Sequence, residues 1–320
     1  MVKWGLTLVL MLPALQLYCW GFFAHRLINE NAVYLLPPEM LVLYRKQIGY
    51  LRNHATDADK RRYILKAEAP RHYIDLDRYG DYPFPDLPRN WTEAVNKYGK
   101  DTLIQHGILP WRILEMMSSL TGAFRKHDGS SILRLSADLG HYIGDAHVPL
   151  HTSSNHNGQL SNQHGIHAFW ESRLPELLAE KEWDFFIDKA VYVHNPAEMI
   201  WKVVMESAAA VDSVLTIEAS LSVNTASDLK YAYEWRNRQL IRQYSGVYSL
   251  SYDRRLNGMV ERRLRQAIHV TASCWYTAWI NAGQPNLTAL NEKLPPEQVL
   301  VVDSLARLWL NRAVKSRSCD

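Results

Sequence analysis

The sequence predicts an all-α fold built as a single multi-helix domain. Apolar residues recur at helical spacing through most of the chain, whereas the strict apolar–polar alternation typical of strands is scarce. There is no internal repeat and no low-complexity linker, so one domain over residues 20–320 is the simplest organisation. A hydrophobic content of 47% is enough to bury a large core.

The expected helices follow this periodicity in chain order. The first two span Glu30 to Leu36 and Met40 to Leu51, and two prolines separate them because proline interrupts a helix. Ser130 or Ser131 could cap the helix that ends at residue 146. The remaining helices are expected at 111–124, 131–146, 167–178, 195–217, 228–244, 257–282 and 296–313, and loops at 79–91 and 148–165.

Residues 1–19 have the organisation of a secretory signal peptide. Lys3 supplies a short positive region, and Leu6 to Leu17 form an apolar stretch that is too short to span a bilayer. No later stretch is long and apolar enough for a transmembrane helix. We therefore expect an exported protein, periplasmic or secreted, whose mature chain begins at Trp20; an uncleaved anchor or a buried N-terminal helix is the alternative.

Charge and cysteine content exclude some classes of protein. The net charge of +3 is too small to require a polyanionic partner. Of the three cysteines, only Cys274 and Cys319 would remain after cleavage, which allows one disulfide but no disulfide framework. Stability must therefore come from packing, with metal ions as a further possible source.

Histidines and carboxylates are clustered near the middle of the chain. Six of the thirteen histidines fall between residues 141 and 167, so the clustering calls for a cause. His141 and Asp145 are four residues apart and share one face of a helix, as do His167 and Glu171. His151 lies between these pairs. Imidazole and carboxylate ligands without cysteine form a zinc-like set that is typical of a hydrolytic site.

A simpler interpretation exists for each feature taken alone. A single His–carboxylate pair at this spacing is usually an exposed helix contact worth a few tenths of a kcal/mol, and only the two pairs together predict a metal site. Gly140 and Gly144 are expected to permit close helix packing. The other histidines are expected not to bind metal: His147, His156 and His164 in the same segment, and the isolated His54, His106, His127, His194 and His269.

Two further segments could complete the metal shells. His72 and one aspartate of the upstream segment 54–59 could bind the first metal. A mature chain that starts at Trp20 would offer its free amine and its carbonyl oxygen as a chelating pair, with His25 close by. An amide nitrogen cannot bind in this way because resonance uses its lone pair.

Taken together, these motifs resemble the zinc-dependent phospholipase C and nuclease P-one superfamily, all-α enzymes with a trinuclear zinc site. The resemblance covers the mature N-terminal half, and the C-terminal half matches only as a helical scaffold. The matching elements are Trp20 and Gly21 with His25, His72 to Asp75, His141 to Asp145 with Pro149 to His151, and His167 with Glu171.

The resemblance implies three zinc ions and a ligand set for each. The first zinc would take Asp57, His72, His141 and Asp145. The second would take His151, His167 and Glu171. The third would take Trp20, His25 and Asp145, which bridges. Asp57 is preferred to Asp59 because it keeps the longer spacing to His72. A metal-bridged hydroxide would attack the phosphorus of a phosphodiester, and Asp57 could orient the attacking water.

The resemblance favours a phospholipase C-like enzyme. Glu171 matches the phospholipase branch, whereas the nuclease branch has aspartate there, and the short gap from His151 to His167 points the same way. One alternative is a nuclease or nucleotidase for single-stranded nucleic acid, with Tyr73 stacking on a base. Another is a non-catalytic protein that uses zinc for folding.

The basic residues near the upstream ligands fit two interpretations. One of them could pair with a phosphate group, although a run of this kind is more often a solvated face. These residues are Lys60, Arg61, Arg62 and Arg71.

Overall fold

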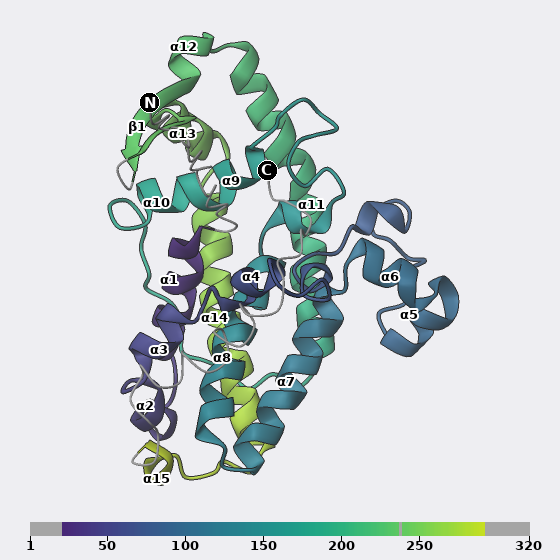
Figure 1. The fold of residues 1–320 in the computed structure, drawn as a ribbon, viewed down its shortest axis with the longest axis vertical. Helices are drawn as coiled ribbons and strands as arrows, with labels where there is room; N and C mark the ends of the chain where they lie inside the picture. Colours follow the sequence, from purple (N-terminus) through teal and green to yellow (C-terminus); the bar gives the residue numbers. More distant parts are fainter. Residues whose placement is uncertain (1–20, 237–238, 292–320) are drawn as a thin grey trace, which may run out of the picture.

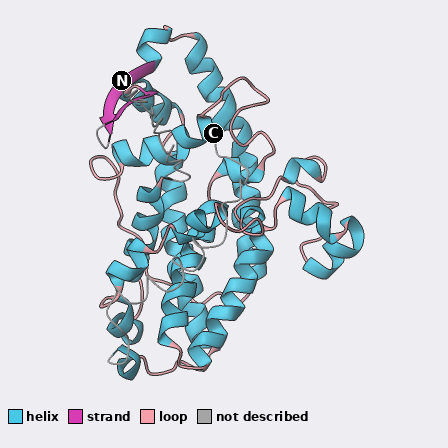
Figure 2. Cartoon of the chain, viewed as in Figure 1, coloured by secondary structure: helices cyan, strands magenta, loops and turns pink. Residues whose placement is uncertain are grey.

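The computed structural model describes residues 21–236 and 239–291, and this part of the chain is mostly helical, as predicted (Figures 1 and 2). The signal peptide, Trp20, Cys319 and the expected helix at 296–313 lie outside the described residues. Cys274 is buried in the core. None of the described helices combines the length and the apolar character needed to cross a bilayer.

Helix α8 (Gly129–Ala146) lies in the middle of the fold and carries two of the predicted ligands. It packs against α1 (Phe22–Val33), α7 (Leu109–Arg125) and α14 (Met259–Asn281) (Figure 1). Nearly all side chains in its last three turns are buried. A helix that is buried all round has to be apolar or hydrogen-bonded on every face, so its few polar side chains must be paired inside the protein.

Two glycines allow α1 to approach α8 closely. A Cβ atom at Gly140 would lie 1.9 Å from the side-chain oxygen of Asn29, and one at Gly144 would lie 3.0 Å from Nδ1 of His25. Asn29 in turn donates hydrogen bonds to the carbonyl oxygens of Leu51 and Ala137, both at 3.1 Å. The prediction that these glycines serve helix packing is confirmed.

The cap of α8 differs from the prediction. The N-cap residue is Asp128, whose carboxylate accepts a hydrogen bond from the backbone N–H of Ser131 at 3.1 Å. Ser130 and Ser131 lie inside the first turn instead. Aspartate is as good an N-cap as serine, and it comes first along the chain.

The segment that follows α1 forms short helices. They are α2 (Pro38–Tyr44), α3 (Ile48–Asn53), α4 (Asp57–Arg62), η1 (Ala69–Arg71) and η2 (Leu76–Arg78). Of these helices, α3 and α4 pack against α8. Two further helices, α5 (Trp91–Tyr98) and α6 (Lys100–His106), project to one side of the fold (Figure 1).

The segment after α8 returns to the same region. It contains η3 (Pro149–Thr152), α9 (Ile166–Ala168), the π-helical turn η4 (Phe169–Arg173) and α10 (Leu174–Leu178). The helix predicted at 167–178 is therefore present, with a π-helical turn in its middle. Such turns are rare and occur often at functional sites.

The helix predicted at 228–244 is wrong. After α11 (Pro196–Val223) and the short α12 (Ser227–Lys230), the chain forms an antiparallel hairpin of β1 (Tyr231–Arg236) and β2 (Gln239–Tyr244). Tyr231, Tyr233 and Trp235 alternate with smaller or polar residues, and aromatic residues at period two favour a strand. The chain continues with α13 (Gly246–Arg255), α14 and α15 (Thr288–Asn291).

Candidate metal centre

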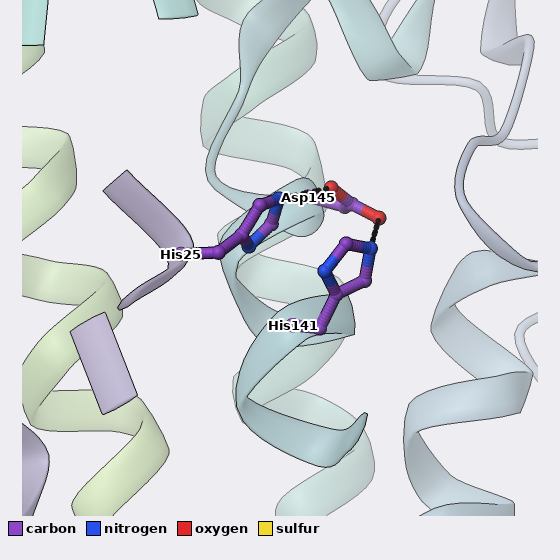
Figure 3. A group of neighbouring side chains, drawn as sticks. All are labelled: His25, His141 and Asp145. Carbon is purple, nitrogen blue, oxygen red and sulfur yellow. Dashed lines mark ion pairs between the residues drawn. The ribbon is translucent and has the colours of Figure 1, made fainter. Parts of the chain in front are cut away.

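The carboxylate of Asp145 lies at the centre of a group of histidines. Its Oδ2 atom is 2.9 Å from Nδ1 of His72 and 3.3 Å from Nε2 of His141. Its Oδ1 atom is 3.4 Å from Nε2 of His25 (Figure 3) and 3.9 Å from Nε2 of His151. All five side chains are buried. The two oxygens of one carboxylate therefore face different histidines, which is the arrangement that a bridging ligand needs.

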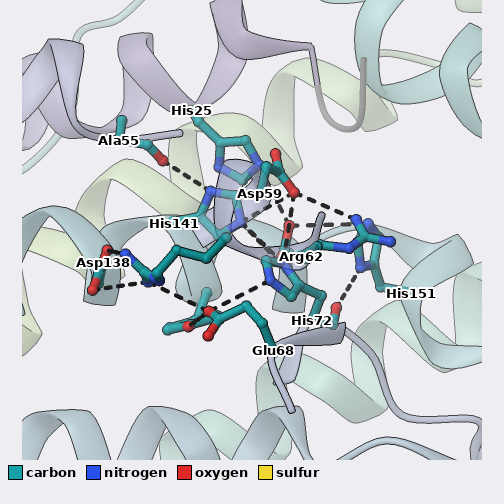
Figure 4. A network of polar contacts seen from close by, with 12 residues as sticks. His25, Ala55, Asp59, Arg62, Glu68, His72, Asp138, His141 and His151 are labelled. Atoms are coloured by element: carbon teal, nitrogen blue, oxygen red, sulfur yellow. Dashed lines mark hydrogen bonds and ion pairs between the residues drawn. The ribbon is translucent and has the colours of Figure 1, made fainter. Parts of the chain in front are cut away.

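Asp59 completes the first group with His72 and His141. Its Oδ1 atom is 3.7 Å from Nδ1 of His72 and 3.7 Å from Nε2 of His141 (Figure 4). These two nitrogens are 3.1 Å apart. The donor atoms of the three residues are close enough to hold one metal ion.

The expected role of Asp57 needs correction. Its carboxylate is held by Nδ1 of His54 at 2.5 Å and by Nζ of Lys60 at 2.8 Å, away from the histidine group. Asp57 and Asp59 are two residues apart on α4, so their side chains leave the helix on nearly opposite sides. Only one of them can face α8. Asp59 lies within reach of His72 and His141, where we expected Asp57; its role as a ligand stays a prediction.

His151, His167 and Glu171 form a second group, as predicted. Oε2 of Glu171 is 3.3 Å from Nε2 of His151 and 3.0 Å from Nε2 of His167. The two Nε2 atoms are 3.1 Å apart. His151 comes from η3, whereas the other two residues flank the π-helical turn.

His25 forms a third group with His141 and Asp145. Its ring stacks on that of His141 with 3.9 Å between the ring centroids. The third zinc was expected to take Trp20, His25 and Asp145; the structure adds His141 to the last two, and Trp20 lies outside the described residues. A Cβ atom at the neighbouring Gly21 would lie 3.0 Å from Oγ of Ser172, so the start of the described chain is packed beside the segment that carries Glu171.

Backbone carbonyls fix the orientation of two ligand rings. Nδ1 of His141 donates to the carbonyl oxygen of Ala55 at 2.8 Å, and Nδ1 of His151 donates to that of His72. In the neutral ring, which is the form that binds metal, a proton on Nδ1 leaves the lone pair on Nε2, and in both residues Nε2 faces the carboxylates. The protein thus presents the metal-binding atom of each ring toward the groups described above.

The buried carboxylates and histidines shift each other's pKa values. Burial opposes the ionisation of Asp145 and Asp59, but the facing histidines outweigh it and lower both pKa values, that of Asp145 well below its usual range. Burial also opposes the charging of His141, but Asp145 and Asp59 raise its pKa to about 9. Burial lowers the pKa of His72 to about 4, so this ring is neutral at pH 7.

The donor set fits metal ions. Within residues 21–236 and 239–291, Oδ2 of Asp59 and Oε1 of Glu171 are buried and make no hydrogen bond. Buried carboxylate oxygens normally have partners, and bound cations are one way to supply them. Imidazole and carboxylate ligands without a thiolate suit zinc and similar divalent ions. All three groups could therefore hold a metal ion.

The sequence did not reveal the polar network behind His72. Arg61 fits neither a phosphate-binding nor a solvated position, because it is largely buried, with Nη2 3.0 Å from Oδ2 of Asp138 and 3.3 Å from Oε1 of Glu68; the two carboxylates are labelled in Figure 4. Tyr142 and Arg71 also donate to Glu68. One signal could have found Glu68, because it precedes His72 by four residues, the spacing of the two ligand pairs.

Arg62 lies beside the first group. Its guanidinium is 3.4 Å from Oδ1 of Asp59, and its side chain is almost fully buried. Tyr73, the expected substrate residue, is partly exposed next to His72 and donates a hydrogen bond to the carbonyl oxygen of Gln105 at 3.2 Å. Among the histidines expected not to bind metal, His147 donates from Nδ1 to the carbonyl oxygen of Ile143 at 2.7 Å.

Comparison with known proteins finds no family model that matches the chain and no matching curated protein.

Proposed function

We propose that this chain is an exported zinc-dependent phosphodiester hydrolase of the phospholipase C type. The observation that carries the proposal is the position of Asp145, whose two oxygens face His25 and His151 on one side and His72 and His141 on the other. A carboxylate shared in this way links three adjacent metal-binding groups. Such an arrangement suits a phosphodiester, whose negative charge is shared by two non-bridging oxygens and increases on the leaving oxygen during hydrolysis.

The residues of the site have separate tasks in this proposal. Zinc bound here would polarise the phosphoryl group and lower the pKa of a bound water. Asp59, Asp145 and Glu171 supply the negative charge that holds the ions. Arg62 places a buried guanidinium beside the first group, where it can pair with a phosphate oxygen.

Phospholipid and single-stranded nucleic acid are the two substrate classes that this centre could serve. Glu171 in the second group favours the phospholipid, because it matches the phospholipase branch of the family that the motifs resemble. The partly exposed Tyr73 beside His72 favours the nucleic acid, because its ring could stack on a base. We take the phospholipid as the principal substrate.

The test starts with the mature protein purified in the presence of zinc. We expect bound zinc by elemental analysis, hydrolysis of bis-p-nitrophenyl phosphate, and faster turnover of a phosphatidylcholine analogue than of single-stranded DNA. Faster turnover of the DNA would move the protein to the nuclease alternative. Tightly bound zinc without hydrolysis of any of the three substrates would leave a non-catalytic zinc protein and overturn the proposal.

A further inference from the structure

Exposed apolar side chains gather at one end of the molecule. Of the fifteen large hydrophobic side chains that are exposed among the described residues, six fall between residues 223 and 247. This segment contains the end of α11, α12, the hairpin and the start of α13, which lie together at the top of Figure 1. The six residues are Val223, Leu229, Tyr233, Trp235, Leu240 and Val247. A concentration of this kind marks an interaction surface.

Near the tip of the hairpin, apolar and cationic side chains share one face. The strand register pairs Tyr233 with Arg242 and Trp235 with Leu240, and directly paired residues lie on the same side of a two-stranded sheet. Trp235 is 75% exposed and Tyr233 is 68% exposed. The base of the hairpin differs, because Tyr244 is buried there.

The hairpin is fixed to the segment that carries two of the candidate metal ligands. Tyr244 stacks on Phe169 with 3.8 Å between the ring centroids. Arg173 forms an ion pair with Glu234 at 2.6 Å and donates to the carbonyl oxygen of Tyr244 at 3.1 Å. Phe169 and Arg173 flank Glu171 by two residues on either side. These contacts join the base of the hairpin directly to the segment that carries His167 and Glu171.

The described face of the hairpin also carries a cation. Arg242 lies on the side of Tyr233 and Trp235, and the acidic residue of the two strands is Glu234. Arg173 already pairs with Glu234. The surplus of positive charge is complementary to a surface that carries anionic groups.

We propose that the hairpin and its flanking helices dock the protein on a lipid surface that contains anionic headgroups. Tryptophan and tyrosine favour the boundary between water and hydrocarbon, and arginine is attracted to anionic lipids. The aliphatic residues Val223, Leu229 and Val247 gain from contact with acyl chains, whereas they cannot stack on nucleic-acid bases. The purpose of docking rests on the proposed phospholipase C-like function, since such an enzyme has to reach its substrate in a bilayer.

The experiment is a flotation assay of the zinc-loaded protein with two kinds of vesicle. We expect binding to vesicles of phosphatidylcholine and phosphatidylglycerol in equal parts, weaker binding to phosphatidylcholine alone, and loss of the difference at high salt. The double variant Tyr233→Ser/Trp235→Ser should lower the partition coefficient about ten-fold or more, because both aromatic rings leave the interface. Arg242→Gln should lower it about five-fold.

The matched control is Phe186→Ser, which removes another exposed aromatic ring, outside residues 223–247, where the side chain is 86% exposed. It should bind vesicles like the unchanged protein. Thermal unfolding of every variant checks that the fold is retained. Hydrolysis of bis-p-nitrophenyl phosphate without vesicles reports on the metal centre separately, because this soluble substrate does not need the hairpin.

These measurements separate the two proposals. Equal flotation of the double variant and the unchanged protein, or no flotation at all, overturns lipid docking even if the soluble substrate is hydrolysed. Flotation that depends on Trp235 without any hydrolysis supports docking and removes the enzymatic proposal. Binding of a single-stranded oligonucleotide that is lost in the double variant, with no vesicle binding, would identify a nucleic-acid surface and overturn the lipid surface.

Discussion

Oε1 of Glu68 lies 3.8 Å from Nε2 of His72, while Nδ1 of the same ring faces Asp145 at 2.9 Å. The buried carboxylate of Glu68 therefore faces Nε2 of His72. Nδ1, the nitrogen that would bind metal, faces the candidate metal centre. The separation is too long for a hydrogen bond, but the negative charge of Glu68 favours a proton on Nε2, and Nδ1 then keeps the lone pair that can bind metal. Glu68 is itself held by Arg61 and Arg71, so its position is well determined.

Glu68→Gln should weaken zinc binding about ten-fold or more, because a neutral amide does not increase the basicity of His72. Competition with a coloured chelator measures the affinity. Glu115→Gln is the matched control, since Glu115 is an exposed glutamate that pairs with Arg112. Equal zinc affinity in Glu68→Gln and the unchanged protein would contradict this role.

Glu68 should also affect acid stability. Burial alone would raise its pKa, but Arg61 and the other facing donors lower it to about 2 from a usual value of 4.5. A depressed carboxyl pKa stabilises the fold above about pH 4.5, and this contribution is lost as the pH falls toward about 2. In urea unfolding of the metal-free protein, the midpoint should therefore fall more steeply over this window than in Glu68→Gln. Parallel curves would show that Glu68 contributes little.

His141→Ala should abolish hydrolysis and lower the zinc content, because Nε2 of His141 belongs to two of the three groups. The loss of one ligand from a zinc site typically removes most of its affinity. His164→Ala provides the control, since His164 comes from the same histidine-rich segment but is exposed. Zinc content is measured by elemental analysis, and unchanged zinc and activity in His141→Ala would refute the assignment.

Two neighbouring aspartates should respond differently to the same substitution. Asp59→Asn should lower zinc content and activity, because it removes a charged donor from the first group. Asp57→Asn should keep the zinc content and instead cost about 1 to 2 kcal/mol of stability, because it breaks the pairing with His54 and Lys60. Elemental analysis and urea unfolding of both variants make the comparison. The reverse pattern would restore Asp57 as the ligand.

An additional residue before Trp20 should selectively weaken the site around His25. The extension turns the free amine into an amide, which cannot bind metal through its nitrogen. Sequencing the N-terminus of the exported protein establishes where the mature chain begins, and zinc titration then compares the two forms. Identical stoichiometry and rate in the extended form would remove Trp20 from the site.

The sequence predicted best those parts of the site that are local. His141 and Asp145, like His167 and Glu171, are four residues apart, and that spacing alone places each pair on one side of a helix. The choice between Asp57 and Asp59 depends on how α4 is rotated relative to α8. That rotation is set by packing between segments far apart in the chain, so spacing to His72 could not decide it.

Two other errors share a physical origin. The segment 228–244 contains aromatic and long polar residues that fit either a helix or a strand, and the hairpin became favourable through contacts such as Tyr244 on Phe169. Arg61 belongs to a basic run that is typical of an exposed face, yet Asp138 and Glu68 compensate its charge inside the protein. In both cases the residue that stabilises the observed structure, Phe169 for the hairpin and Asp138 for Arg61, lies more than seventy residues away in the sequence.

The close approach of α1 to α8 has a consequence for how the centre can change. His25 and His141 stack because Gly140 and Gly144 leave no side chain between the two helix backbones. The separation of His25 from His141 is thus set by main-chain geometry, and a bulkier residue at either glycine would push α1 away from α8. A change in the surface loops would leave this spacing unaltered, because it depends only on the contact between the two helix backbones.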